Sequence, residues 1–274
     1  MAPTGDSDQR LCGLGLWLDA PRPRGTDDDV LEQAAAAAGA AERTGLTSVW
    51  VVETRAEPPD AVPYEAFSML GALATRTDAV HLGLVADGGQ RRPPSILAKL
   101  VSTVDVLSHG RAILSLDGDR SLPADAHRLG EALAVARAVL EDEHPTVDGR
   151  IYSVVDAVNR PAPVQPGGVP LVVFVNGAGP GDALLDRCAR SADAVVVPGG
   201  PESVRDAVTF LGRWTGPRDG RRHPVAVLGR VVVDEQASAA DAVAAVREAG
   251  ADGCLVGVPA PWSAEQVEAL QLHW

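Results

Sequence analysis

The stretch SVWVVETRAEPP, residues 48–59, decides the fold. It opens with an apolar, β-branched run, Ser48 to Val52, which predicts a strand covered on both faces. With no turn between, the run passes into an acid, a hydroxyl and a base, Glu53, Thr54 and Arg55, and then into a proline-rich segment. The role of these polar side chains depends on the fold to which the strand belongs and on which end of that fold the strand reaches at Val52.

Similar apolar runs recur along the chain and alternate with Ala-rich segments of helical spacing. The predicted strands cover 11–17, 48–52, 80–85, 112–116, 171–175, 194–197, 225–233 and 253–257. The predicted helices cover 27–44, 65–76, 95–107, 125–141, 182–191, 202–213, 238–249 and 263–272. This alternation predicts an α/β protein, a (β/α)₈ TIM barrel, which typically takes about 250 residues. A doubly wound open sheet is disfavoured because no G-x-G-x-x-G turn follows the first strand.

One connection is too long for this scheme. Residues 143–170 are proline-rich and contain VDGRIYSV, a turn signal followed by an alternating run, which predicts a short β-ribbon between helix 4 and strand 5. We expect a structural flap there, which could pack in a homodimer. The predicted organisation is a flexible segment over 1–10 and one barrel domain over 11–274.

Composition excludes several classes of protein. The chain has 274 residues and a net charge of −13, which argues against a nucleic-acid partner. No apolar run reaches the roughly 18–20 residues that span a bilayer, and the first ten residues lack the apolar core of a signal peptide. The three cysteines are far apart, and no histidine pair has metal-ligand spacing, so neither a disulfide framework nor a metal site is predicted. A cytoplasmic protein acting on a small molecule is the expectation.

Polar segments follow the predicted strands at the barrel mouth, where such barrels carry their active sites. Glu53 admits two interpretations: an ion pair with Arg55 that orders the mouth, or a proton donor in an apolar pocket. The candidates for contact with a substrate are Trp17, as an apolar wall, and Asp19, Arg55, Tyr64 and Asp117. Asp19 and Tyr64 are alternatives to Glu53 as the source of the proton.

Four blocks of sequence resemble a known family. They are AERTGLTSVWVVE (41–53), RPPSILAKLVSTVDVLSHGRAIL (92–114), HRLGEALAVARAVL with VDGRIYSV (127–154), and PAPVQPGGVPLVVFVNGAGPGDALLDRCARSADAVVV (161–197). In this order they resemble the bacterial luciferase-like monooxygenase superfamily over roughly 11–258. The resemblance implies a barrel that binds the deazaflavin coenzyme F-420, the first choice, or FMN, the alternative. Lys99 is the only lysine, a sign of a G+C-rich genome, and such hosts favour the deazaflavin.

The resemblance also implies where the cofactor would lie. Its phosphate tail is expected at the loop after strand 5, Asn176, Gly177, Ala178 and Gly179, with Gly199 and Gly200 as companions, because glycines leave backbone N–H groups open to an anion. A non-proline cis peptide is expected between Val85 and Ala86, under the ring. The motif Asp105, Ser108, Gly110 and Arg111 precedes strand 4 at the barrel bottom and is expected to be structural.

Two departures from the family pattern bear on catalysis. Thr54 stands where many relatives have a histidine, and a threonine hydroxyl is no general base near neutrality. The connection after strand 4 is short and lacks the usual long insertion. These departures favour simple hydride transfer to an unsaturated or carbonyl-bearing molecule over oxygen activation. The alternative is a degenerate barrel that binds a flavin or a partner protein without turnover.

Overall fold

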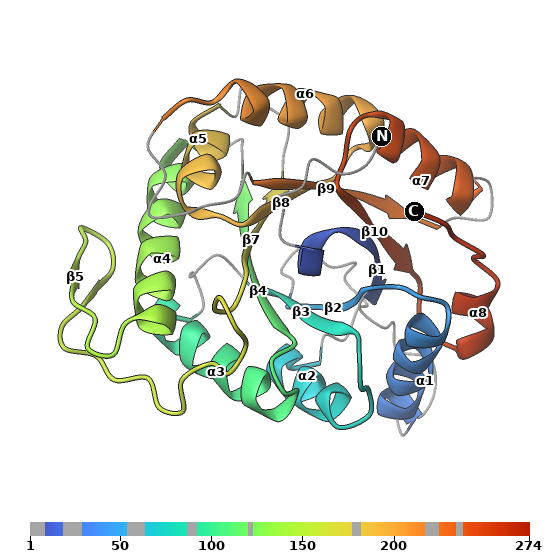
Figure 1. The fold of residues 1–274 in the computed structure, drawn as a ribbon, viewed down its shortest axis with the longest axis horizontal. Coiled ribbons are helices and arrows are strands. Elements are labelled where there is room, and N and C mark those ends of the chain that lie inside the picture. The colour runs from blue at the N-terminus through green and yellow to red at the C-terminus, as the bar shows by residue number, and fades with distance from the viewer. Residues whose placement is uncertain are drawn as a thin grey trace.

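A closed barrel of parallel strands organises the computed structural model, with helices around its outside (Figure 1). The structure describes residues 9–18, 29–53, 64–86, 92–119, 123–176, 182–216, 225–233 and 238–274. The barrel strands are β1 (Gly13–Leu18), β2 (Ser48–Val52), β3 (His81–Ala86), β4 (Ala112–Asp119), β7 (Leu171–Asn176), β8 (Ala194–Val197), β9 (Ala226–Val232) and β10 (Gly253–Val258). They follow one another around the barrel in chain order, and β1 closes against β10. The predicted (β/α)₈ barrel is confirmed.

The helices of the described ranges lie between successive strands. They are α1 (Val30–Arg43), α2 (Ala66–Ala74), α3 (Pro94–Leu107), α4 (Pro123–Glu141), α5 (Asp182–Ser191), α6 (Gly200–Arg213), α7 (Ala239–Glu248) and α8 (Ala264–Glu268). The last helix is shorter than predicted, because it ends at the C-cap Ala269 and the chain reaches a left-handed conformation (φ 45°) at Gln271.

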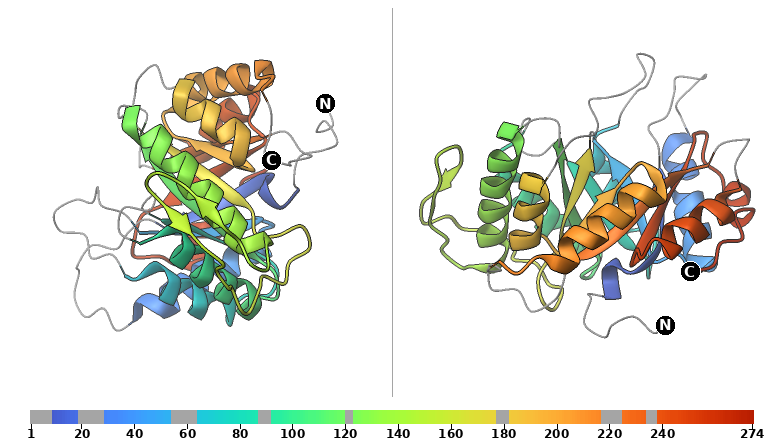
Figure 2. Two further views of the ribbon diagram at one scale, coloured as in Figure 1. Left: turned by 90° about the vertical axis from the view of Figure 1, so that its left-hand side faces the viewer. Right: turned by 90° about the horizontal axis from the view of Figure 1, so that it is seen from above.

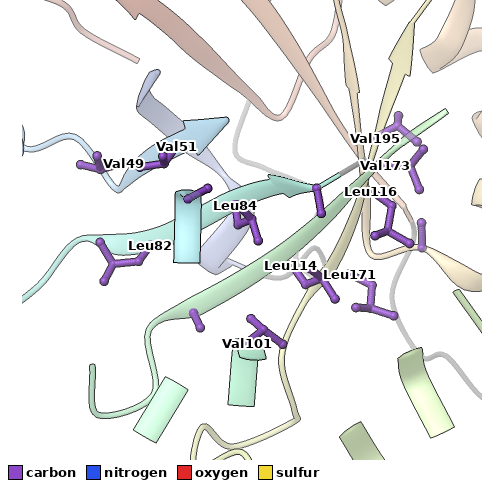
Figure 3. Close-up of a cluster of buried hydrophobic side chains, with 14 of the residues drawn as sticks. Val49, Val51, Leu82, Leu84, Val101, Leu114, Leu116, Leu171, Val173 and Val195 are labelled. Atoms are coloured by element: carbon purple, nitrogen blue, oxygen red, sulfur yellow. The ribbon is translucent and has the colours of Figure 1, made fainter. Parts of the chain in front are cut away.

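Two layers of apolar side chains hold the barrel together. Outward-facing residues of the strands pack under the helices, and Figure 3 shows part of this outer core, which includes Val49, Leu82, Leu114 and Val173 of the strands and Val101 of α3. Inward-facing residues fill the barrel itself. Trp50 is its largest fully buried side chain, and Gly83 on the neighbouring strand leaves space for the indole. Alternation along each strand therefore separates the outer core from the interior.

The excursion between α4 and β7 is a small hairpin, as predicted. Its strands β5 (Val147–Asp148) and β6 (Ser153–Val154) pair antiparallel, and the hairpin stands outside the helix ring beside α4 (Figures 1 and 2). Glu131 of α4 holds its turn by accepting hydrogen bonds from the backbone N–H groups of 150–152. Whether the hairpin packs in a homodimer stays a prediction.

The family motif at the barrel bottom is structural, as expected. Asp105 is fully buried and accepts hydrogen bonds from the backbone N–H groups of Val164 (2.7 Å) and Gln165 (3.1 Å), which ties the excursion to α3. The buried guanidinium of Arg111 donates to the carbonyl oxygens of Thr77 (2.8 Å) and Val80 (2.7 Å), among others. The motif thus joins α2, α3, β4 and the excursion.

Candidate functional site at the carboxyl end of the barrel

Glu53 lies where β2 ends, on the helix side of the barrel wall. Its backbone N–H donates to the carbonyl of Val85 (3.0 Å), so the pairing with β3 continues past the strand. Val51 packs in the outer core and Val52 in the interior, so alternation places the Glu53 side chain outward. Glu53, the first residue after the apolar run of the opening stretch, is therefore in the barrel wall, facing the first turns of α2 and α3.

Arg92, two residues before α3, forms an ion pair with Glu53. The Glu53 side chain is 11% exposed and that of Arg92 27% exposed, so the pair is shielded from most of the solvent. The other arm of Arg92 donates to Glu65 (3.1 Å). A single guanidinium thus bridges two carboxylates that come from β2 and the start of α2.

Glu65 also caps α2. Its carboxylate accepts from the backbone N–H of Phe67 (3.3 Å) and Ser68 (2.7 Å) and from the Ser68 hydroxyl (2.7 Å). Burial alone would raise the pKa of Glu65, but these hydrogen bonds and the charge of Arg92 bring it below its usual value. The cap and the ion pairs together order the wall of the mouth between β2 and β3.

The expected partner of Glu53 was Arg55, which lies outside the described residues. The ion pair that the structure shows is made by Arg92, 39 positions along the chain, and the pairing with Arg55 stays a prediction. Spacing within the opening stretch could not have identified this contact.

Inside the mouth, an aromatic pair forms one wall. Trp17 of β1 and Phe174 of β7 have ring centroids 4.8 Å apart with planes inclined at 43°. Both are nearly fully buried, and Val52 and Val85 belong to the same interior cluster. Trp17 thus belongs to the apolar interior at the carboxyl end of the barrel, and its role as a wall for a substrate stays a prediction.

Arg230 of β9 lies over this wall. It follows the inward-facing Ala226 and Leu228 at alternate positions, and its Cζ is 4.4 Å from the centroid of the Trp17 ring. We did not single it out from the sequence. The sequence did offer a signal: Arg230 alternates with apolar residues that face the barrel interior. A charged side chain at such a position needs a partner or a ligand.

Polar side chains follow the inner face of β4. Ile113 lies in the interior cluster, so alternation turns Ser115, Asp117 and Asp119 the same way. Asp119 is paired in register with Asn176, the last residue of β7. The Ser115 hydroxyl is fully buried and has no hydrogen-bond partner among the described residues. Such a group is satisfied when a water or a ligand atom reaches it.

Gly199 and Gly200, the expected companions, lie at the start of α6. Both have left-handed φ values, 100° and 83°, and Gly199 is the N-cap of a 14-residue helix. A Cβ built on Gly200 would meet no atom within 4 Å, so its backbone borders open space. Free N–H groups at such a helix start suit a phosphate.

The remaining candidates are placed as follows. Asn176 ends β7 half-buried, and Tyr64 packs against the outer core rather than the barrel interior. The candidates outside the described residues are Asp19, Thr54, Arg55, Gly177, Ala178 and Gly179. Their roles stay predictions.

The expected cis peptide is wrong. Among the described residues, the cis bonds are Arg160–Pro161 and Ala260–Pro261, so the bond between Val85 and Ala86 is trans. Both residues continue the regular pairing of β3 with β4 up to Leu116, and a strand in regular register has no need of a cis bond at that point.

The mouth fits the flavin-type cofactor implied by the resemblance. Apolar side chains of Trp17, Phe174 and Val85 can bound a planar ring, the buried Ser115 hydroxyl has no hydrogen-bond partner within the described ranges, and the start of α6 presents a helix N-terminus of the kind that suits a phosphate. No three His, Cys, Asp or Glu side chains of the described ranges group together as metal ligands. Within these ranges, no helix could span a membrane.

Comparison with known proteins agrees with this architecture. A family model described as luciferase-like monooxygenase matches residues 14–269. The F420-dependent glucose-6-phosphate dehydrogenase of Kineococcus radiotolerans is 29% identical over 205 residues, 65% of this chain and 59% of the relative. The 5,10-methylenetetrahydromethanopterin reductase of Methanolobus tindarius is 24% identical over 218 residues, 75% of this chain and 63% of the relative. The chain thus spans about three fifths of the length of these relatives.

Solved structures share the fold. The coenzyme F420-dependent tetrahydromethanopterin reductase of Methanopyrus kandleri superimposes with a TM-score of 0.73 at 16% identity, covering 95% of this chain and 97% of that one. An F420-dependent secondary alcohol dehydrogenase gives a TM-score of 0.70 at 18% identity, with the same coverage. With the family match over 14–269, the barrel topology and the ordered sequence blocks, these findings establish that the chain belongs to the luciferase-like monooxygenase family.

Proposed function

We propose that the protein is an oxidoreductase that binds reduced deazaflavin coenzyme F-420 and transfers hydride to an unsaturated or carbonyl-bearing small molecule. One structural observation carries the proposal. An apolar aromatic wall, Trp17 with Phe174, and a glycine-flanked helix start, Gly199–Gly200, stand at the same end of one barrel. The F420-dependent enzymes among its relatives support deazaflavin over FMN.

The cofactor, when bound, supplies the hydride, and the chain supplies binding, orientation and a proton. Trp17, Phe174 and Val85 would exclude water from one side of a planar ring, and the start of α6 would hold its phosphate tail. Reduction of a carbonyl places the hydride on carbon and requires a proton at oxygen. Two described residues on the inner face of β4, Asp117 and Asp119, are acids able to exchange that proton.

Glu53 takes the ordering role in this proposal. Its carboxylate pairs with Arg92 on the helix side of the wall, which favours the first of the two interpretations over direct proton donation. Thr54 would contribute at most a hydrogen bond to the bound ring.

A second candidate function is binding without turnover. It is favoured by the connection from β4 to α4, which takes only residues 120–122 and lacks the long insertion that the family resemblance leads one to expect there.

Titration of the purified protein with coenzyme F-420 and with FMN, followed by absorbance, tests both functions. The proposal expects saturable binding of F-420 and oxidation of its reduced form by at least one carbonyl or enoate compound in a panel. Binding with no oxidation by any member of the panel favours the second candidate. Binding of neither cofactor contradicts the proposed oxidoreductase and leaves, of the second candidate, only the binding of a partner protein.

Gly200→Val is expected to weaken F-420 binding by at least tenfold, because the new side chain enters the open space at the start of α6 and strains a backbone at φ 83°. Gly45→Val is the matched control. Gly45 also has a left-handed φ, 81°, and no atom within 4 Å of a built Cβ, but it lies at the other end of the barrel, between α1 and β2. The measurement is the dissociation constant of F-420 for each variant, from fluorescence titration. Equal effects of the two variants would show that the start of α6 is not part of the cofactor site.

Glu53→Gln is expected to lower the free energy of unfolding by about 1–2 kcal/mol, because the shape is kept but the shielded partner of Arg92 is lost. Turnover should stay within about threefold of the parent. Glu268→Gln is the control, since its pair with Arg43 is largely exposed. A fall in kcat of about a hundredfold with unchanged stability would reinstate Glu53 as the proton donor.

A further inference from the structure

Ser115 places a hydroxyl in the apolar interior of the barrel. It follows the inward-facing Ile113 at the alternate position of β4. In register with it stand Val85 of β3 and Val172 of β7, which belong to the interior cluster and offer only methyl groups. The side chain is fully buried, and its hydroxyl has no hydrogen-bond partner among the residues that the structure describes.

Several buried hydroxyls elsewhere in the molecule are satisfied by the protein itself. Those of Thr77 and Ser102 each donate to the carbonyl four positions earlier (2.8 Å), and that of Ser48 accepts from the Trp50 indole (2.9 Å). A strand offers Ser115 no such carbonyl, because the backbone of β4 pairs with a strand on each side. A buried polar group without a partner costs free energy, so this position weakens the cofactor-free protein.

Ser115 lies at the depth of interior residues that keep some exposure. Its register partner Val85 is 5% exposed and pairs in turn with Val52, which is 8% exposed. One alternate position nearer the mouth stands Asp117, in register with Phe174 of the aromatic pair. Because Ser115 itself is covered, a ligand atom reaches its hydroxyl only when neighbouring side chains move apart on binding.

We propose that the Ser115 hydroxyl forms a hydrogen bond with a polar ring atom of the cofactor when the cofactor binds in the mouth. A hydroxyl donates to a ring carbonyl or accepts from a ring N–H, so it suits either kind of polar atom. The methyl groups of Val85 and Val172 beside it keep the contact dry, which strengthens the hydrogen bond. This inference rests on the proposed function, because it adds a residue to the same cofactor site.

The test compares Ser115→Ala with the parent in two measurements, urea unfolding without cofactor and titration with F-420. Removing a hydroxyl that has no partner should raise the urea midpoint or leave it unchanged. Losing one hydrogen bond to the ring should weaken F-420 binding by about five- to tenfold. The absorption maximum of bound F-420 should also differ from that in the parent, because a hydrogen bond to the ring perturbs its π system. We thus expect weaker binding by a protein that is at least as stable.

Ser102→Ala is the matched control. Ser102 is also fully buried, but its hydroxyl donates to the Ala98 carbonyl (2.8 Å) and accepts from the Asn159 amide (2.8 Å). Its loss should lower the urea midpoint, because two hydrogen bonds disappear. The affinity for F-420 and the spectrum of bound F-420 should stay as in the parent, because Ser102 lies on α3, outside the barrel.

Two outcomes would overturn the inference. A fall in the urea midpoint of Ser115→Ala as large as that of Ser102→Ala would show that a buried water satisfies the hydroxyl without cofactor. Equal F-420 affinity of Ser115→Ala and the parent would show that the ring does not reach it. Failure of the parent itself to bind F-420 would contradict the proposed function and this inference together, whereas unchanged affinity in the variant contradicts this inference alone.

Discussion

Arg111→Met is expected to lower the free energy of unfolding by about 4 kcal/mol, the largest effect anticipated for a single substitution here. The guanidinium donates to the carbonyl oxygens of Ala74 (3.1 Å), Thr77 (2.8 Å), Val80 (2.7 Å) and Ser108 (2.8 Å) and to the Thr77 hydroxyl (2.9 Å). Methionine fills a similar volume but leaves these acceptors buried without a donor, which costs far more than the net value of the hydrogen bonds themselves.

Urea unfolding measures this loss, and the midpoint of thermal unfolding should fall by about 10 °C. Arg111→Lys should be intermediate, because an ammonium reaches fewer of the acceptors. Arg43→Met removes an arginine whose ion pair with Glu268 is exposed and should change stability by less than about 1 kcal/mol. A loss below about 1.5 kcal/mol for Arg111→Met would mean that water replaces the guanidinium and that the motif is not a structural clamp.

Gly83→Ala is expected to cost about 3 kcal/mol, although it adds a single methyl group. A Cβ on Gly83 would lie 2.3 Å from Cδ2 and 2.4 Å from Cε3 of Trp50. The indole cannot move aside easily, because it is 1% exposed inside the barrel and its Nε1 donates to the Ser48 hydroxyl (2.9 Å). The methyl group must therefore displace packed interior side chains or the strand itself.

A double-mutant cycle separates this clash from a general weakness of β3. Trp50→Leu alone should destabilise through the cavity that it leaves, by about 3 kcal/mol. Combined with Gly83→Ala, it should cost at least 1.5 kcal/mol less than the sum of the two single changes, because leucine vacates the space that the methyl group needs. Additive losses in urea unfolding would show that the indole is not what excludes a side chain at position 83.

The local pattern of apolar and polar residues was sufficient to predict the barrel, because the periodicities of strands and helices are set by residues close together in the chain. The apolar run at 48–52 predicted the bounds of β2 as they stand, and the alternation of such runs with Ala-rich segments predicted the closed parallel topology. Glu53, which follows that run, was also correctly interpreted as lying at the end of the strand. The segment 263–272 was less informative, because several helix-compatible residues continue beyond Glu268, where the chain turns away.

Contacts between distant positions depend on barrel closure, which no local pattern encodes. The sequence by itself determined the barrel, its mouth and the family, since these follow from periodicity and from blocks of residues in order. Only the tertiary structure decided that Glu53 pairs with Arg92, that Arg230 lies on Trp17, and that the Val85–Ala86 bond is trans. The reason is geometric: strands far apart in the chain meet at one end of the barrel, and their register and the alternation of their side chains select which groups touch.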